Sequence, residues 1–448
     1  MQPDSIGGVV RAPRFLAFAC GQTVSQFGDK LDQMALVAIL GTLGTGPRAA
    51  WSLAELAVVV ALPVILFGPV AGVLVDRWDR RATLVAGDII RGALVASIPL
   101  AHRFAGLWPI YVIVFLVFRV TLVSNAAKMA VVPDLVERRQ LLAANSLTTS
   151  LGRVATVAGI VLGGLVIDWS VWARFGWTGY EAAFYLDGVS FVFSALMLAI
   201  AVPAAPAARR ALRAVRTAPG GRGSPDNGVR RIARDFGEAV RLVRSDRGLT
   251  FVFTTIALIA ASVGAGYVVL VVLIQTILAF GASGLGVIGG MGAGGMVLGS
   301  LLAGTVVRRQ PRRLVIATGT LALGLLVIAF ANVSTFTGAA VAAMLVGAFM
   351  APIVIAQDTW LQEALPERVR GRGFAIRELL NNAVGAGGSV LGAGAVAVFG
   401  ATGLADPYRA TLVAIGLTVV AATIALQALS RAQVARDKAK ECPTPEVL

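Results

Sequence analysis

Three charged side chains interrupt the first long apolar segment of the chain, residues 14–43. Asp29 and Asp32 are three residues apart, so they share one face of a helix, whereas Lys30 between them points elsewhere. A charged carboxylate inside an apolar helix is costly, and such residues typically serve a proton or substrate pathway. The chemistry that these residue types predict is reversible proton uptake, with Asp29 or Asp32 as the carrier.

Four further ionisable residues lie within later apolar segments and are candidates for a proton or substrate site: Arg119, Arg153, Asp187 and Asp358. The two arginines would favour neutral or anionic substrates. Asp358 corresponds to Asn125 at a sequence offset of 233 (358 − 125), which predicts equivalent places in two repeated halves. The alternative is that such residues only form pairs near the helix ends, which we favour for Arg377 and Glu378.

The elements that must position these residues are long apolar helices. The 448 residues are 57% hydrophobic and only 14% charged, whereas an ordinary soluble protein has about 25% charged residues. The apolar residues form runs of about 20 residues or more, which is long enough to cross a bilayer, and they lack the residue-by-residue alternation of a membrane barrel. We therefore predict an all-α polytopic membrane protein.

Twelve transmembrane helices are predicted, six on each side of a polar segment. Their expected ranges are 14–43, 52–75, 83–104, 108–131, 141–168, 181–202, 249–280, 284–307, 313–332, 335–362, 373–399 and 408–430. The expected domains are an N-terminal six-helix bundle at 1–202, a linker at 203–248, a C-terminal six-helix bundle at 249–430 and a tail at 431–448. Within the linker, the apolar spacing from Val229 to Val243 favours an amphipathic helix on the membrane surface over a solvated loop.

The net charge of +15 is explained by membrane topology rather than by a nucleic-acid partner. Arginines gather in alternate connections between the predicted helices, at 77–81, 138–139, 308–313 and 368–372. The opposite connections hold few basic residues, such as Arg48 and Arg174. Because basic loops stay on the cytoplasmic side, both termini are predicted to be cytoplasmic.

No metal ion or cofactor is expected. Cys20 and Cys442 lie in different segments and have no ligand-like neighbours. The pattern Gly284-x-Gly286-x2-Gly289 matches a dinucleotide-binding motif, but no strand precedes it, so we interpret it as a helix-packing face. A Walker-type phosphate loop is absent from the sequence, which argues against direct use of ATP.

A charged turn separates the second and third apolar segments and recurs in the second half. Its pattern, Gly72-x3-Asp76-Arg77-x2-Arg80-Arg81, is matched by Gly304-x3-Arg308-Arg309-x2-Arg312-Arg313 at a sequence offset of 232 (304 − 72). A second pair, Pro133-Asp134 and Pro366-Glu367, has an offset of 233 (366 − 133). Two membrane-embedded halves of the same design are typical of secondary transporters.

The first copy of this turn resembles the signature loop of the major facilitator superfamily. The matching residues are Gly72, Leu74, Asp76, Arg77, Arg80 and Arg81, with Asp79 in place of the usual glycine. Together with Asp88-x2-Arg91, the turn is similar to the branch that holds macrolide-efflux proteins and enterobactin exporters. The resemblance implies a twelve-helix transporter fold and a latch, in which Asp76 pairs with basic residues and a helix end to hold the outward-open state. The alternative is a loop that only fixes topology.

The fifth predicted helix carries small residues at Gly152, Gly159, Gly163 and Gly164. They are similar to the antiporter motif of the same superfamily, although Ile160 stands where the motif has proline. Two interpretations stay open for these glycines, namely antiport specificity or ordinary close packing of helices.

The activity implied by the resemblance is proton-coupled export of an amphipathic or hydrophobic small molecule by alternating access. Such a protein is not an enzyme; its partners are the substrate, protons and the lipid bilayer, and it is expected to be a monomer in a bacterial-type plasma (inner) membrane. One alternative is a lysophospholipid or lipid transporter of the same superfamily, because Phe27-Gly28-Asp29 is similar to a motif of bacterial lysophospholipid transporters. A membrane sensor is disfavoured, since the longest polar segment, 203–248, is short for a signalling domain.

Overall fold

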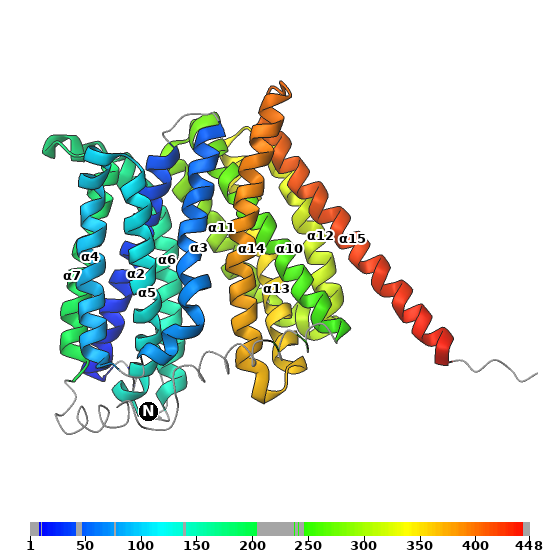
Figure 1. Ribbon diagram of the computed structural model, residues 1–448, viewed down its shortest axis with the longest axis horizontal. Helices are drawn as coiled ribbons and strands as arrows, with labels where there is room; N and C mark the ends of the chain where they lie inside the picture. Colours follow the sequence, from blue (N-terminus) through cyan, green and yellow to red (C-terminus); the bar gives the residue numbers. More distant parts are fainter. Residues whose placement is uncertain are drawn as a thin grey trace, which may run out of the picture. The chain divides into compact units, whose positions relative to one another are not determined.

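Long helices make up nearly all of the part of the chain that the structure describes. The computed structural model describes residues 9, 11–41, 47–75, 78–137, 140–203, 237, 241 and 246–441 (Figure 1). The helices of the N-terminal half are α2 Pro13–Gly41, α3 Pro47–Val75, α4 Arg80–Ala105, α5 Trp108–Leu135, α6 Leu141–Asp168 and α7 Gly179–Ala201. Those of the C-terminal half are α10 Arg247–Val272, α11 Gly281–Arg309, α12 Arg312–Ala331, α13 Phe336–Ala364, α14 Glu367–Ala401 and α15 Pro407–Glu441. None of the described residues lies in a strand, so the predicted all-α fold is confirmed.

Eleven of these helices are long and apolar enough to cross a membrane. The exception among the twelve is α2, whose apolar run is interrupted by Asp29, Lys30 and Asp32. The same charged residues include Asp29 and Asp32, which are the proton carriers predicted from the sequence.

The ends of the helices follow local capping. Asp79, which replaces a glycine of the signature loop, caps α4 because its Oδ1 accepts a hydrogen bond of 2.9 Å from the Ala82 amide. Thr178 and Glu181 form a reciprocal capping box at the start of α7. At the other end of the chain, α15 continues to Glu441, beyond the predicted end at 430, through a segment rich in Ala, Arg and Lys, which are good helix formers.

The α-helical part of α10 ends earlier than predicted. A single π-helical turn, Leu273–Ile277, follows Val272, and the chain then bends at Ala279 and Gly281, whose φ angles are 55° and 67°. A π turn inserts one extra residue into the helix. The turn contains no proline or glycine, so its position could not be predicted from the sequence.

The chain divides into two compact units. The first unit comprises residues 1–237 and 270–290, and the second comprises residues 238–269 and 291–448. In the first unit α2 packs against α6 and α7, while α4 packs against α5 and α7, and α3 packs against α5; these helices are the blue, cyan and blue-green to green ribbons of Figure 1. Its core includes Phe15, Phe18, Leu84 and Leu198, all nearly inaccessible to solvent.

The second unit is built from the C-terminal helices. Helix α12 packs against α13 and α15, and α14 packs against α15 and α13. Helix α10 joins them through polar contacts, because Gln357 of α13 donates a 3.1 Å hydrogen bond to Thr255, and the Ser389 hydroxyl of α14 donates a 3.0 Å bond to the Gly264 carbonyl. Apolar side chains such as Ile256 and Ile353 fill the interior.

Candidate functional site

Helices α2 and α7 approach each other closely at Gly28. A Cβ atom at this position would lie 2.9 Å from the Ser190 Cβ of α7, which is nearer than real side chains come. The missing side chain lets the polar group of Asp187 and Ser190 face the backbone of α2. Glycine is therefore required here by packing rather than by backbone conformation.

Asp187 is completely buried at this contact. Its Oδ1 accepts a hydrogen bond of 2.9 Å from the Ser190 hydroxyl, while its Oδ2 is buried without a hydrogen-bond partner. A buried acceptor without a partner loses its hydration and gains nothing in return. Asp187 thus keeps one buried carboxylate oxygen that could still accept a hydrogen bond.

Three carboxylates form one electrostatic group around this contact. Asp32 is 6% exposed, and its Oδ1 also lacks a hydrogen-bond partner. The charges of Asp29 and Asp32 act on each other and on Asp187. Two carboxylates from α2 and one from α7 therefore share an interior region of the first unit, which will be called the acidic cluster (Asp29, Asp32 and Asp187).

Two cations, the buried Arg91 and the half-buried Lys128 of α5, act on the acidic cluster. Arg91 of α4 has no exposed surface, forms an ion pair with Asp88, and stacks its guanidinium 4.4 Å above the ring centroid of Phe191. The charges of Arg91 and Lys128 act on Asp29. The charges of α2, α4, α5 and α7 are thus joined in one network inside an apolar bundle.

Lys30 has a different partner. Its ammonium group donates a 2.8 Å hydrogen bond to Gln33 Oε1, one turn further along α2. Its charge still acts on Asp29 and Asp32, so it contributes to the network at a distance.

The remaining candidates from the sequence lie elsewhere. In α5 the guanidinium carbon of Arg119 lies 5.1 Å from the ring centroid of Phe67, and in α6 the side chain of Arg153 is exposed. In the second unit Arg377 Nε lies 2.9 Å from Asp358 Oδ1, an ion pair that is too poorly aligned for a hydrogen bond. The ion pair is formed by Asp358 and Arg377 rather than by Arg377 and Glu378.

The charged turn before α4 is described in part. Asp76 and Arg77 lie outside the described residues, as do Arg138, Arg139 and most of the linker with its predicted amphipathic helix at 229–243. Gly72 belongs to the end of α3. Arg80 Nη1 contacts Asp134 Oδ2 at 2.8 Å, and Arg81 donates a 2.8 Å hydrogen bond to the Ala199 carbonyl. These two arginines hold the start of α4 to the ends of α5 and α7.

The equivalent turn in the second half makes an analogous contact. Arg312 at the start of α12 lies 2.5 Å from Glu363 near the end of α13. Arg80 and Arg312 are related by the same sequence offset of 232 (312 − 80), and each joins the first residue of a helix to an acid at the end of the next helix. The acids are not equivalent in sequence, because Asp134 corresponds to Glu367 (367 − 134 = 233) and Glu363 lies four residues earlier. The two halves therefore share the arginine and the kind of contact, but not the same acid.

The glycines of α6 lie at two helix contacts. A Cβ at Gly159 would be 2.6 Å from the Lys30 Cβ, and one at Gly163 would be 3.1 Å from the Met34 Cγ; Gly152 faces Gln26. Gly164 instead faces the start of α11, where Asp168 Oδ2 accepts a 2.7 Å hydrogen bond from the Ser283 amide. Gly286 of the dinucleotide-like pattern also lies against α6, since its Cβ would be 2.7 Å from the Ile160 carbonyl.

The sequence pointed to the acidic cluster but not to its cations. Asp29, Asp32 and Asp187 were recognised because they interrupt apolar segments, whereas Arg91 entered only through the spacing Asp88-x2-Arg91. Lys128 was missed, although it too lies in an apolar segment and could have been found by the same rule.

Comparison with known proteins places this architecture in a family. The sequence profile of the Major Facilitator Superfamily matches residues 18–389 and 256–442. A macrolide efflux protein A of Streptococcus pyogenes is 29% identical over 189 residues, which are 42% of this chain and 44% of that protein. An uncharacterised transporter of the same type from Mycobacterium bovis is 34% identical over 150 residues, or 33% of this chain and 34% of that one. The chain thus spans less than half of the length of these relatives.

Solved structures share the fold. A crystal structure of the nucleoside transporter NupG matches with a TM-score of 0.69 and 12% identity, covering 92% of this chain and 98% of that one. Identity this low is informative about architecture alone. The profile match across most of the chain, the twelve helices and the repeated turn agree, and the chain belongs to the major facilitator superfamily.

Proposed function

We propose that the protein exports amphipathic or hydrophobic small molecules in exchange for protons. The observation that carries this proposal is the acidic cluster of α2 and α7, in which Asp187 is completely buried, Asp32 is 6% exposed and Asp29 is half-buried. Buried ionisable residues in membrane segments are costly and typically mark an ion or proton path. The relative from Streptococcus pyogenes is named a macrolide efflux protein, which supports export as the direction of transport.

The charge balance of the network suggests how a proton is used. Four carboxylates interact in this region, the three of the acidic cluster and Asp88, and three cations act on them: Arg91, Lys128 and Lys30. With every group charged, one negative charge remains without a counter-ion. One bound proton would neutralise this charge. The oxygens that would bind it are Asp32 Oδ1 and Asp187 Oδ2, which are buried and have no hydrogen-bond partner.

Alternating access would connect this proton to transport. In the proposed orientation the arginine-rich turns, including Arg80 and Arg312, face the cytoplasm, as positively charged loops do. The acidic cluster would take a proton from outside and release it inside as the two units rock, while Asp76 would latch the outward-open state. We place the protein in a bacterial-type plasma membrane as a monomer with two six-helix bundles.

A ligand screen followed by a transport assay tests the proposal. Purified protein would be heated with erythromycin, a hydroxamate or catecholate siderophore, or a lysophospholipid, and the shift of its unfolding midpoint would be measured. The stabilising compound would then be offered to everted vesicles. We expect uptake into everted vesicles that requires a proton gradient and stops when the gradient is collapsed.

Two outcomes would contradict the proposal. Uptake that continues after the proton gradient is collapsed would remove proton coupling. Stabilisation and movement of lysophospholipid alone, without a proton gradient, would favour the lipid transporter instead. Empty vesicles and vesicles with an Asp29→Asn and Asp32→Asn double variant provide the matched controls.

A further inference from the structure

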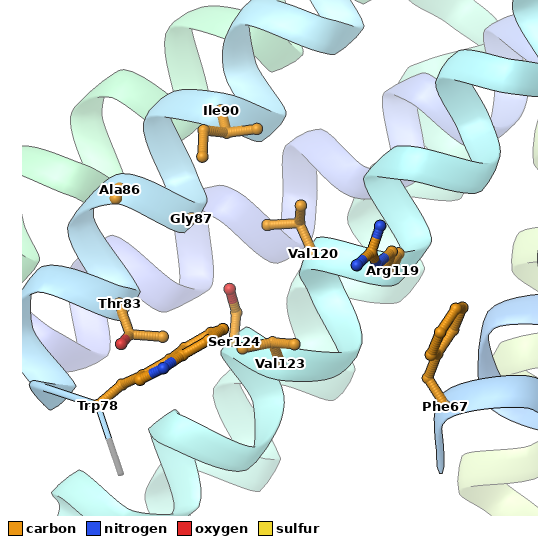
Figure 2. Close-up of a pocket in the computed structure, with 10 residues that line it drawn as sticks. All are labelled: Phe67, Trp78, Thr83, Ala86, Gly87, Ile90, Arg119, Val120, Val123 and Ser124. Carbon is orange, nitrogen blue, oxygen red and sulfur yellow. The ribbon is translucent and has the colours of Figure 1, made fainter. Parts of the chain in front are cut away.

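A separate apolar pocket opens between α3, α4 and α5 of the first unit. It has a volume of about 390 Å³ and is walled by Phe67, Trp78, Ile90, Val120 and Val123 (Figure 2). Ligand pockets usually have volumes of roughly 300–1,000 Å³ and mostly apolar walls, with a few polar groups that orient the ligand. None of the residues of the acidic cluster lines this pocket.

One cation stands at the wall of the pocket. Arg119 is exposed, and its guanidinium carbon lies 5.1 Å from the ring centroid of Phe67, which holds it beside the apolar walls. In the described part of the chain Arg119 forms no ion pair with a carboxylate. An arginine without a counter-ion in an apolar setting favours an anionic ligand, because guanidinium and carboxylate form charge-assisted hydrogen bonds.

A buried hydroxyl lies inside the same pocket. Ser124 is 1% exposed, and its Oγ has no hydrogen-bond partner. It faces Gly87 of α4, where a Cβ atom would lie only 2.6 Å from the Ser124 Oγ, and Figure 2 shows this oxygen directed into the space between the two helices. A donor without an acceptor favours a ligand that carries oxygen over a pure hydrocarbon.

We propose that this pocket binds an amphipathic carboxylate with a single apolar chain, of the fatty-acid type. Its carboxylate would pair with Arg119, and its chain would lie against Trp78 and Val123. The volume is near the lower end of the range for ligand pockets, so it suits one chain rather than the two chains of a phospholipid. This inference does not depend on the proposed transport activity.

Fluorescence quenching tests the proposal, because a tryptophan lines the pocket. The probe is 9,10-dibromostearate, whose bromine atoms quench tryptophan on contact, and the matched neutral probe is 9,10-dibromostearyl alcohol. Both would be titrated into the purified full-length protein in detergent. We expect saturable quenching by the acid, which disappears in Trp78→Phe although the other six of the seven tryptophans remain.

The charge of the ligand is tested at Arg119. Arg119→Gln should weaken binding of the dibrominated acid about tenfold while leaving the alcohol unchanged, since only the acid loses a charge-assisted contact. Arg119→Lys keeps the positive charge and should retain most of the affinity for the dibrominated acid. That result would show that the protein tolerates a substitution at this position. Arg48→Gln, an exposed arginine at the far end of α3, is the matched control and should have no effect.

Filling the pocket tests its location. Val123→Phe should abolish saturable quenching while the protein keeps its elution volume and its unfolding midpoint. The proposal is overturned if wild-type protein shows no saturable quenching, if quenching persists in Trp78→Phe, or if Arg119→Gln weakens the acid and the alcohol equally. Stronger binding of a dibrominated diacyl phospholipid than of the free acid would also contradict it.

Discussion

Two ion pairs that involve residues of α4 show how burial changes the role of a charge. Arg91 and Asp88 are both fully buried, whereas Arg80 and Asp134 retain 27% and 59% of their side-chain exposure. Exposed pairs contribute little, because water already solvates each partner. Within a buried pair, removal of one partner strands the other charge away from water.

This contrast predicts unequal effects of the same chemical change. Asp88→Asn should destabilise the protein by about 3–5 kcal/mol because Arg91 loses its counter-ion, whereas Asp134→Asn should cost about 0–1 kcal/mol. Unfolding midpoints of the purified variants in detergent provide the measurement. Equal midpoints for the two variants would show that Asp88 is not needed to offset the cost of burying the charge of Arg91.

At this scale the sequence predicts which residues are unusual but not which ones meet. Asp29 and Asp187 stand out because each interrupts an apolar run. They come together only because α2 packs against α7, and nothing in the spacing of residues 29 and 187 predicts that contact. The partner of Arg377 could not be predicted either. Glu378 is its neighbour in the sequence, but Asp358 is its ion-pair partner in the structure.

The twelve helices were predictable because a long apolar run leaves the backbone few alternatives in a membrane. The irregular features of these helices were harder to predict from the sequence. Asp79 looked like a departure from the signature loop, and its reason is the cap of α4. The π turn at Leu273–Ile277 has an ordinary apolar sequence, so its position depends on packing rather than on local preference.

The contact between α2 and α6 makes a prediction about one glycine. Gly159→Ala should lower the unfolding midpoint, because its Cβ would lie 2.6 Å from the Lys30 Cβ and 2.8 Å from the Phe27 carbonyl oxygen. Such overpacking typically costs about 1–3 kcal/mol. The control is Gly68→Ala in α3, where the nearest atom is Val64 Cγ1 at 3.9 Å, and where alanine should instead favour the helix.

Differential scanning fluorimetry of both alanine variants would measure the two midpoints. A Gly159→Ala midpoint equal to that of Gly68→Ala would mean that α2 and α6 can move apart without cost. In that case the glycines of α6 would need an explanation other than close packing.

For the whole molecule, the internal repeat was readable from the sequence because both halves keep the same arginine turn. The pairs Arg80–Asp134 and Arg312–Glu363 show that the equivalent arginines make the same kind of contact, although with acids at different positions of the repeat. The substrate was not readable, since no fixed motif for a ligand accompanies the fold, and one architecture serves many transported molecules.

The arginine distribution predicts the orientation of the protein in the membrane. In a variant without Cys20 and Cys442, single cysteines at Arg48 and Arg174 should react with an impermeant maleimide added to intact cells. A cysteine at Arg222, in the linker outside the described residues, should react only after permeabilisation. Labelling of the Arg222 position from outside would reverse the proposed orientation.

The central claim is that the acidic cluster exchanges a proton when substrate binds. It is tested most directly by adding the ligand found in the thermal screen to purified protein in weakly buffered solution and measuring the protons released. Wild-type protein and Asp406→Asn, whose carboxylate pairs with Arg409 in the second unit, should release protons. The Asp29→Asn and Asp32→Asn double variant should still bind the ligand but release none. Undiminished proton release from that double variant, and also from a triple variant that adds Asp187→Asn, would contradict the account.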